Sequence, residues 1–323
     1  MPQLSLVIPV YHCAGCLKEL HRRLGKTLGE MKVSYEIIFV EDGGKDSSWE
    51  VLKDLCQKDP KTTAFRLSRN FGQHAAITAG LSQCSGDWAV VMDCDLQDQP
   101  EEIPLLFQKT KEGFDIVLTK RVRKKQNLYR NLAARLYFFL MNIFNNKAMD
   151  GSVGSFSIIS RKVIDAYLSL GDMDRHYLFI LRWLGFQTAT LEYQHTERFS
   201  GKSSYHFRSL ISHAFNGLFF QTTRLLRWII YLGLGISFSG FLLALYFVFL
   251  YFYRSIPPGW TSLATLILII GGFIIVSTGI TGLYIGKIFE QVKQRPLFIF
   301  DRQAGKKTFR MSKTNAPKRK LHG

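Results

Sequence analysis

The residues best suited to chemistry are carboxylates that follow short apolar runs. Asp93 and Asp95 are separated by one residue and come directly after the apolar run at 88–92. Two carboxylates at this spacing can hold a divalent cation, and Mg²⁺ prefers one or two carboxylates together with water and phosphate oxygens. A cation held in this way offsets the charge that develops on a departing diphosphate. The pair alone is a weak signal, because Asp-x-Asp also occurs in loops as a helix cap.

Two other apolar runs also end in residues that suit ligand binding. The run at 35–41 is followed by Asp42-Gly43-Gly44, which could hydrogen-bond a base or a ribose or could form a plain turn. The run at 4–9 ends in Pro9-Val10-Tyr11. Neither Gly-x-Gly-x-x-Gly nor a Walker motif occurs at a turn between a strand and a helix, which removes the main support for dinucleotide and P-loop sites.

These polar ends must be brought together by a sheet. The first ~195 residues alternate between short apolar runs and amphipathic stretches, a pattern that predicts an α/β domain with a largely parallel sheet. Ligands of such sheets bind beyond the carboxyl ends of the strands, so the polar ends would meet on one rim. Strands are expected at 4–9, 35–41, 63–67, 88–92 and 115–119, with helices that include 47–58 and 74–84.

The C-terminal third of the chain has a different composition. Residues 228–253 and 255–286 contain no charged side chain, and these runs of 26 and 32 residues each exceed the ~20 residues that cross a bilayer. Arg254 and a short Pro-Pro-Gly turn separate them. The pattern predicts two transmembrane helices joined by a tight hairpin. The alternative is a buried helical pair in a soluble protein.

The net charge of +17 is concentrated beside these apolar runs and in the tail. Positive residues gather on the cytosolic side of membrane proteins, so the N-terminal region and the tail are expected to be cytosolic. Anionic lipid headgroups are a nearer partner for these residues than nucleic acid. The basic stretches at 128–144 and 204–226 have aromatic or aliphatic helical faces. Each could lie in a membrane interface or pack as an ordinary helix.

Five cysteines occur, and in a cytosolic setting they are expected to be reduced. Cys13 and Cys16 have the spacing of redox or zinc ligands, but no second ligand pair accompanies them. We interpret them as small residues at the start of a helix.

Five segments together resemble family 2 glycosyltransferases with the GT-A fold. They are Val-Ile-Pro-Val-Tyr at 7–11, Glu-Asp-Gly-Gly at 41–44, Leu-Ser-Arg-Asn-Phe-Gly-Gln-His at 67–74, Asp-Cys-Asp-Leu-Gln-Asp at 93–98 and Pro-Glu-Glu-Ile-Pro at 100–104. More narrowly, the chain is similar to the polyprenyl-phosphate glycosyltransferases. The similarity continues through residues 197–205 and the two apolar runs, so it covers nearly the whole chain.

The resemblance implies a role for particular residues. Asp93, Asp95 and Gln97 would bind Mg²⁺ or Mn²⁺ on the donor diphosphate. The nucleotide-sugar site would be formed by Pro9, Tyr11, Asp42, Asp93 and Arg121. The lipid phosphate would be bound by Arg130, Arg198, Lys202 and Ser203. Catalysis is expected to depend on Asp95, Arg130 and Arg198.

Three positions depart from the family pattern. Glu41 stands where many members have aspartate, and Ala134 stands where relatives often have a serine near the acceptor phosphate. Asp150 is the nearest candidate for an aspartate that many members carry before the next strand. Asp98 could act as a base in principle, but we interpret it as a helix cap ahead of Pro100.

The expected fold is therefore an α/β, Rossmann-like GT-A domain at 1–203, interfacial helices at 204–227, a two-helix transmembrane hairpin at 228–290 and a basic cytosolic tail at 291–323. The expected activity is inverting, metal-dependent transfer of a sugar from a nucleotide-sugar, of the UDP class, to undecaprenyl or another polyprenyl phosphate. It would take place at the cytosolic face of the inner membrane and serve cell-envelope glycans such as lipopolysaccharide or O-antigen. A homo-oligomer is expected, with no nucleic acid partner.

Two alternatives stay open. A processive polysaccharide synthase would carry Gln-x-x-Arg-Trp, but here the glutamine is missing before Arg182-Trp183, and two helices alone cannot enclose a channel. A non-catalytic membrane partner of a lipid-sugar flippase would retain the fold without a reason to retain the carboxylates and arginines.

Overall fold

The computed structural model describes residues 2–121, 153–193 except 174, scattered positions between 231 and 249, and 259–305. Its contacts divide the chain into two compact units. The first comprises Met1–Gln126, Asp150–Ser203 and Arg295–Gly323, and the second comprises Asn127–Met149 and Ser204–Gln294. The unit that contains the N-terminal domain therefore takes in the chain from Arg295 onward, which the sequence had assigned to a separate tail.

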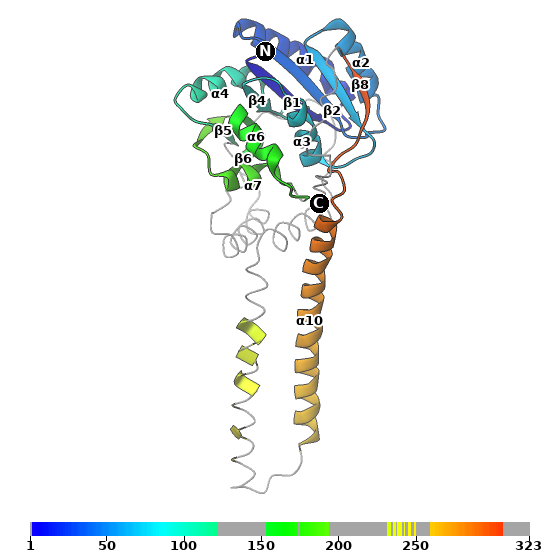
Figure 1. The fold of residues 1–323 in the computed structure, drawn as a ribbon, viewed down its shortest axis with the longest axis vertical. Helices are drawn as coiled ribbons and strands as arrows, with labels where there is room; N and C mark the ends of the chain where they lie inside the picture. The colour runs from blue at the N-terminus through cyan, green and yellow to red at the C-terminus, as the bar shows by residue number, and fades with distance from the viewer. Residues whose placement is uncertain are drawn as a thin grey trace, which may run out of the picture. The chain divides into compact units, whose positions relative to one another are not determined.

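The first unit is built on a mixed sheet of eight strands in the described residues, in the order β7-β5-β6-β4-β1-β2-β3-β8 (Figure 1). Six strands run in one direction, and β6 and β8 run against them. The prediction of an α/β domain with a largely parallel sheet is confirmed. The strands are β1 (Leu4–Val10), β2 (Tyr35–Glu41), β3 (Thr62–Leu67), β4 (Trp88–Val91), β5 (Ile116–Arg121), β6 (Val153–Ser160), β7 (Thr188–Tyr193) and β8 (Phe300–Ala304).

The five strands predicted from the sequence appear as β1 to β5; β2 has the predicted bounds, and the ends of the other four are shifted by one or two residues. The strands β6, β7 and β8 were not predicted. β8 has the sequence Phe-Asp-Arg-Gln-Ala and pairs antiparallel with β3, Ala64 opposite Ala304. Such a polar edge strand has no apolar run to reveal it. The structure thus corrects the assignment of the whole 291–323 segment to a tail, because residues 300–304 belong to the sheet.

Helices cover both faces of the sheet and enclose two apolar cores (Figure 1). On one face, α1 buries Leu17, Leu20, Leu24 and Leu28 completely, an apolar stripe at helical spacing. That core also takes in α2 and α4, while α3, α6 and α7 supply the core on the other face. The helices are α1 (Ala14–Glu30), α2 (Ser48–Lys58), α3 (Gln73–Gln83), the 3-10 turn η1 (Pro100–Glu102), α4 (Ile103–Thr110), α6 (Arg161–Ser169) and α7 (Tyr177–Leu184).

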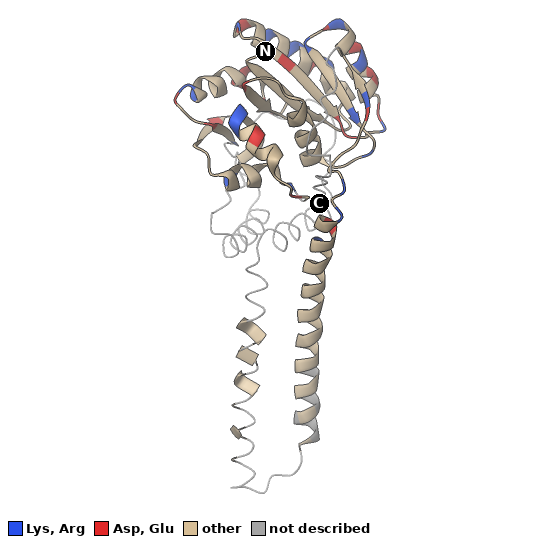
Figure 2. Ribbon diagram, in the orientation of Figure 1, with Lys and Arg blue, Asp and Glu red and all other residues tan. Residues whose placement is uncertain are grey.

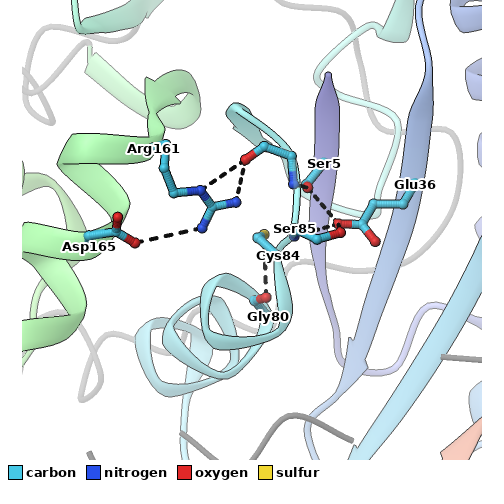
Figure 3. Close-up of polar contacts among 8 residues, drawn as sticks. Ser5, Glu36, Gly80, Cys84, Ser85, Arg161 and Asp165 are labelled. Atoms are coloured by element: carbon cyan, nitrogen blue, oxygen red, sulfur yellow. Dashed lines mark hydrogen bonds and ion pairs between the residues drawn. The ribbon is translucent and has the colours of Figure 1, made fainter. Parts of the chain in front are cut away.

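The turn between α3 and β4 is fixed to the amino ends of the central strands (Figure 3). Glu36 Oε1 accepts hydrogen bonds from Ser5 Oγ at 2.7 Å and from the backbone N–H and hydroxyl of Ser85 at 2.7 and 2.8 Å. The N–H of Gly86 donates to Ser5 Oγ at 2.9 Å, and Arg161 Nε donates to the carbonyl of Gly86 at 3.0 Å. These bonds fix the end of α3 and the start of β4. They thereby also set the positions of the start of α3 and the end of β4.

The second unit contains α10 (Trp260–Val292), whose charged residues lie only near its C-terminal end (Figure 2). Within the part of the chain that the structure describes, one helical segment, Ile270–Val292, is long and apolar enough to cross a membrane. It overlaps the second predicted span. The first predicted span, 228–253, lies largely outside the described residues, and its described positions between 231 and 249 are helical.

Gly86→Ala tests the fixed turn. A Cβ at this position would lie 2.7 Å from Ser5 Oγ and 2.9 Å from Ser5 N, so the turn would have to move away from β1. We expect the free energy of unfolding to fall by about 1–3 kcal/mol, the usual cost of overpacking. The measurement is the thermal unfolding midpoint of the full chain in detergent.

Gly25→Ala is the matched control. Gly25 lies inside α1 and a Cβ there meets no atom within 4 Å. Because alanine is the better helix former by about 1 kcal/mol, this variant should be as stable as the wild type or more so. Equal midpoints for both variants would contradict the proposed role of the turn.

Candidate active site

The site lies where β1 parts from β4. Pairing between these strands ends at Val7 opposite Val91, whereas β1 continues to pair with β2 as far as Val10 opposite Glu41. Val7 accepts a bond from Met92 N–H on the β4 side. The backbone N–H and C=O groups of alternate residues point toward the same neighbouring strand. Pro9 is therefore the next residue of β1 whose backbone faces β4, and it has no N–H to donate. The strands diverge here, and β1 is also where the sheet order reverses, the usual ligand position in α/β sheets.

Asp42 stands at the end of β2, on one side of this divergence. It is 3% exposed, and its two carboxylate oxygens accept the backbone N–H groups of Phe71 at 2.7 Å and Gly72 at 2.9 Å. Burial raises the pKa of this carboxyl, although the two N–H groups favour its ionised form. Asp42 therefore holds the loop 68–72 against the end of β2. The sequence had assigned it only to the nucleotide pocket.

Gly43 makes this close approach possible. It has a φ of +64°, and a Cβ there would lie 2.4 Å from the carbonyl carbon of Arg69 and 2.6 Å from the N of Asn70. Only glycine satisfies both the left-handed backbone and the contact with the loop. The Asp-Gly pair is thus a docking point for the loop, which explains its occurrence after β2 better than a plain turn does.

An ion pair between a buried glutamate and a partly exposed arginine supports the same turn. Glu41 is 1% exposed, its Oε2 lies 2.9 Å from Arg66 Nε, and its Oε1 accepts the N–H of Gly44. Arg66 also donates to the carbonyl of Gly44 at 3.1 Å. Burial raises the pKa of Glu41, against the lowering effects of Gly44 N–H and Arg66. The glutamate that departs from the family pattern therefore binds the turn and the next strand.

The Asp-x-Asp pair stands on the other side of the divergence, just past β4. Asp93 Oδ1 accepts bonds from Gln73 Nε2 at 2.7 Å and from Ser155 Oγ at 3.1 Å. Asp95 Oδ1 accepts the N–H of Gln97 at 3.2 Å. All three predicted metal ligands, Asp93, Asp95 and Gln97, are partly exposed. The structure thus brings them together in one turn at the carboxyl edge of the sheet.

The turn itself has an uncommon backbone. Leu96 has a φ of +61°, a backbone conformation that residues other than glycine, asparagine and aspartate rarely adopt. Its side chain is 3% exposed, so burial in the core helps to hold the turn in place. The apolar residue between Asp95 and Gln97 therefore anchors the turn while the polar residues on either side stay accessible.

Pro9 lies near the carboxyl end of β1, and Tyr11 directly follows the strand. Pro9 is buried, whereas Tyr11 is 46% exposed and its ring packs edge-on against His12 at 4.3 Å. The described part of the chain holds no group of three or more His, Cys, Asp or Glu side chains arranged for a metal ion. Two partly exposed carboxylates nevertheless fit a cation whose other ligands are phosphate oxygens and water, the preference of Mg²⁺.

Comparison with known proteins shows the family of the chain. Residues 5–168 match the family described as Glycosyl transferase family 2. The chain belongs to this family.

Two relatives are similar to this family 2 glycosyltransferase over most of their length. The undecaprenyl-phosphate 4-deoxy-4-formamido-L-arabinose transferase of Proteus mirabilis is 33% identical, over 94% of this chain and 95% of that one. The SfII prophage-derived bactoprenol glucosyl transferase of Shigella flexneri is 32% identical, over 92% and 97%. Among solved structures, glucosyl-3-phosphoglycerate synthase from Mycobacterium tuberculosis in complex with Mn²⁺ and UDP-glucose covers 68% of this chain and 77% of its own, with 15% identity and a TM-score of 0.45. The relatives confirm the resemblance found in the sequence motifs.

Asp98 differs from its predicted role in this glycosyltransferase. It is completely buried and accepts a hydrogen bond from the hydroxyl of Tyr193, the last residue of β7. No side-chain cap is formed at η1, whose N-cap residue is Gln99. The helix-cap interpretation is therefore wrong. Asp98 instead ties the segment after the Asp-x-Asp turn to the end of β7.

Several predicted residues cannot be placed with the rest. Arg121 ends β5 at the carboxyl edge of the sheet, opposite Tyr193, but its side chain is outside the described residues. The predicted phosphate-binding residues Arg130, Arg198, Lys202 and Ser203, together with Ala134 and Asp150, lie outside the described residues altogether.

The cysteine pair lies at the start of α1, as predicted. Cys13 precedes the helix and Cys16 lies in its first turn, and both are buried free thiols. Cys13 Sγ donates to the carbonyl of Cys94 at 3.2 Å, and hydrogen bonding to Cys94 together with burial raises the pKa of Cys13. Both side chains belong to the apolar core on this face of the sheet, which also includes Cys94 and Leu96 of the Asp-x-Asp turn.

Two residues at the site were missed from the sequence, Gln73 and Ser155. Gln73 lies inside the motif at 67–74, so the motif itself was the available signal. Ser155 lies in β6, which no sequence pattern predicted. Its position follows from the antiparallel register that sets Val91 opposite Ser157 and so brings Ser155 level with Asp93.

Asp42→Asn tests the buried carboxylate through pH. A carboxyl whose pKa is higher in the folded chain adds stability that is fully present below the unfolded pKa and is lost as pH rises through the folded pKa. We therefore expect the thermal midpoint of the wild type, relative to Asp42→Asn, to fall as the pH rises from about 4, the ordinary pKa of aspartate.

Asp54→Asn provides the opposite case. Asp54 is exposed on α2, and its hydrogen bond with Lys58 lowers its pKa. The thermal midpoint of the wild type minus that of Asp54→Asn should therefore rise or stay constant over the same pH range. If the difference in thermal midpoint between the wild type and Asp42→Asn does not change with pH, the carboxyl of Asp42 has an ordinary pKa.

Proposed function

We propose that this glycosyltransferase moves a sugar from a nucleotide-sugar to a polyprenyl phosphate at the cytosolic face of a membrane. The observation that carries the proposal is the pair of partly exposed carboxylates, Asp93 and Asp95, at the divergence of β1 and β4. The relatives named as undecaprenyl-phosphate and bactoprenol transferases support a lipid phosphate acceptor. We propose a UDP-sugar as the donor class and undecaprenyl phosphate as the acceptor, and leave the sugar itself open.

The donor site follows from the arrangement at the carboxyl edge. The nucleotide would lie between the end of β1, with Pro9 and Tyr11, and the loop that Asp42 holds in place. The diphosphate would then reach Asp93 and Asp95 beside β4. Arg121, at the end of β5 on the same edge, would meet the phosphate, because guanidinium pairs with phosphate oxygens through two parallel N–H bonds.

A divalent cation fits the carboxylates present. Asp93 and Asp95, with Gln97, would hold Mg²⁺ or Mn²⁺, which supplies compensation for the charge on the departing diphosphate. Asp95 accepts the N–H of Gln97, and Asp93 accepts bonds from the neutral side chains of Gln73 and Ser155 within the described residues, so both carboxylates are oriented before any ligand arrives. Orientation in advance lets such groups act without reorganising during the reaction.

The acceptor explains why no strong protein base is needed. A polyprenyl phosphate oxygen is already anionic near neutral pH, so it can attack the anomeric carbon in a single displacement with inversion. Asp98, once considered as a base, is fully buried and bonded to Tyr193. We propose that Arg130, Arg198, Lys202 and Ser203 position the lipid phosphate. Most of the rate acceleration would then come from positioning and electrostatics.

A membrane location suits this acceptor. The isoprenoid chain must stay in a bilayer, and Ile270–Val292 of α10 is long and apolar enough to cross one. We propose that 228–253 forms a second span, that both termini are cytosolic, as the basic residues around the spans favour, and that the chain assembles with copies of itself. Residues 204–227 would then lie at the cytosolic membrane interface.

Asp95→Asn tests the carboxylate that we place at the centre of the chemistry. Asparagine keeps an oxygen for the N–H of Gln97, so the turn is retained while the negative charge is lost. Loss of metal-assisted stabilisation is worth several kcal/mol, so we expect transfer to fall by roughly 10²-fold or more. The assay is mass spectrometry of undecaprenyl phosphate incubated with the full chain, Mg²⁺ and a panel of sugar nucleotides, with and without EDTA.

The matched control is Asp54→Asn, the same substitution at an exposed position on α2. It should transfer sugar at the wild-type rate. A fully active Asp95→Asn variant would refute the metal assignment, and a wild-type protein that binds nucleotide but yields no glycosyl-phosphoryl lipid with any donor would refute the proposed reaction.

Arg198→Ala and Arg198→Lys test the acceptor site. A hydrogen bond to a charged group contributes about 1.5–3 kcal/mol, so the KM for lipid phosphate should rise roughly 10–100-fold. Arg198→Lys should not restore the wild-type KM for lipid phosphate fully, because lysine lacks the planar guanidinium group of arginine. The KM for the donor should stay constant. In the control variant Arg22→Ala, which removes an exposed arginine paired with Glu19, the KM for the donor and the KM for lipid phosphate should both equal those of the wild type. An unchanged lipid KM would exclude Arg198 from the acceptor site.

A further inference from the structure

Hydrogen bonds, together with the backbone from Gly72 to Gln73, connect the end of β2 to Asp93 and to β6 across the carboxyl edge of the sheet. Asp42, at the end of β2, accepts the N–H of Gly72, and the next residue, Gln73, is the first of α3. Gln73 Nε2 donates to Asp93 Oδ1 at 2.7 Å, and Ser155 Oγ of β6 donates to the same oxygen at 3.1 Å. The first carboxylate of the Asp-x-Asp pair is therefore held by elements on both sides of β4.

Among the described residues, the two donors to Asp93 that come from Gln73 and Ser155 are neutral. A carboxylate accepts but does not donate, so Gln73 must turn its NH₂ group toward Asp93 and its carbonyl oxygen away, and chemistry alone fixes the amide orientation. The amide and the hydroxyl orient Asp93 without cancelling its negative charge. A lysine at the same place would orient the carboxylate too, but it would set a positive charge beside the position of a divalent cation.

Contacts with other helices hold the start of α3, so the backbone of Gln73 has a fixed position. The backbone N–H of Tyr177 donates to His74 Nδ1 at 3.4 Å, one residue beyond Gln73. One turn further, the hydroxyls of Thr78 and Tyr167 hydrogen-bond at 3.0 Å. These contacts attach α3 to α6 and α7 and limit how far the side chain of Gln73 can shift relative to β4.

We propose that Gln73, together with Ser155, is a positioning residue that presents Asp93 to the cation of the donor diphosphate. Because Gln73 directly follows the loop held by Asp42, it also couples the cation to the nucleotide bound beside that loop. The inference rests on the proposed function for the nature of the ligand. Groups that orient a metal ligand in this way typically contribute about 10–100-fold to metal affinity.

The test is Mn²⁺ binding by the full chain in detergent, followed by the electron paramagnetic resonance signal of the unbound ion, with and without UDP. Gln73→Ala removes one of the two described donors to Asp93, and we expect roughly tenfold weaker binding. Gln73→Lys keeps a donor but adds a charge. Its binding should also weaken, and the weakening should shrink at high ionic strength because salt screens the added charge.

Two further variants separate local from general effects. Gln57→Lys adds the same charge on the exposed side of α2 and should bind Mn²⁺ like the wild type. Ser155→Ala removes the other donor and should weaken Mn²⁺ binding in the same direction as Gln73→Ala. In transfer assays, excess Mn²⁺ should restore kcat in Gln73→Ala, whereas a merely structural defect would lower the thermal midpoint and would not respond to metal.

The outcomes are distinct. Wild-type Mn²⁺ affinity in both Gln73→Ala and Gln73→Lys would overturn the positioning role, and an unchanged gain in Mn²⁺ affinity on adding UDP to Gln73→Ala would overturn the coupling. A wild-type protein without Mn²⁺ binding would overturn the inference together with the metal assignment. If the variants bind as expected but no lipid phosphate is glycosylated by the wild type, the role of Gln73 stands and the proposed acceptor fails.

Discussion

The divergence of β1 and β4 beyond Val7 and Val91 is the constraint on which the site depends. Two parallel strands in the middle of a sheet normally leave no room for a ligand between them. Here Pro9 lacks the N–H that would extend the pairing, and the sheet order reverses at β1. Asp42 therefore stands on one side of the divergence and the Asp-x-Asp turn on the other. The loop 68–72 and the start of α3 connect the two sides through hydrogen bonds.

Burial divides the carboxylates of this edge into two groups with different tasks. Glu41, Asp42 and Asp98 are almost inaccessible, and each is bonded to a backbone N–H, an arginine or a tyrosine hydroxyl. Such groups hold turns and loops, because a polar group away from water is stable only when it is hydrogen-bonded or paired. Asp93 and Asp95 stay partly exposed at the end of β4. Their exposure leaves them open to a cation and a diphosphate, while the bonds that they accept from Gln73, Ser155 and Gln97 orient them.

The way the chain runs through the two units also bears on function. The stretch Ser204–Gln294 belongs to the second unit, and the chain then re-enters the first, where Phe300–Ala304 pairs with β3 as β8. The apolar segment is thus inserted between two parts of the catalytic unit rather than appended to it. An inserted segment is joined to that unit by the chain at both of its ends. This suits an enzyme whose proposed acceptor has one end in a bilayer.

The sequence by itself determined the α/β class, five strands and their order along the chain, the long apolar segment, and the residue types of the Asp-x-Asp turn. Periodicity and local motifs are properties of neighbouring residues, so one sequence is enough to detect them. The tertiary structure decided what depends on contacts between distant residues. It showed that Asp42 binds the loop 68–72, that Asp98 bonds Tyr193 and caps no helix, and that Gln73 and Ser155 converge on Asp93. It also placed polar β8 in the sheet, because an edge strand is selected by the partner it pairs with and not by an apolar pattern of its own.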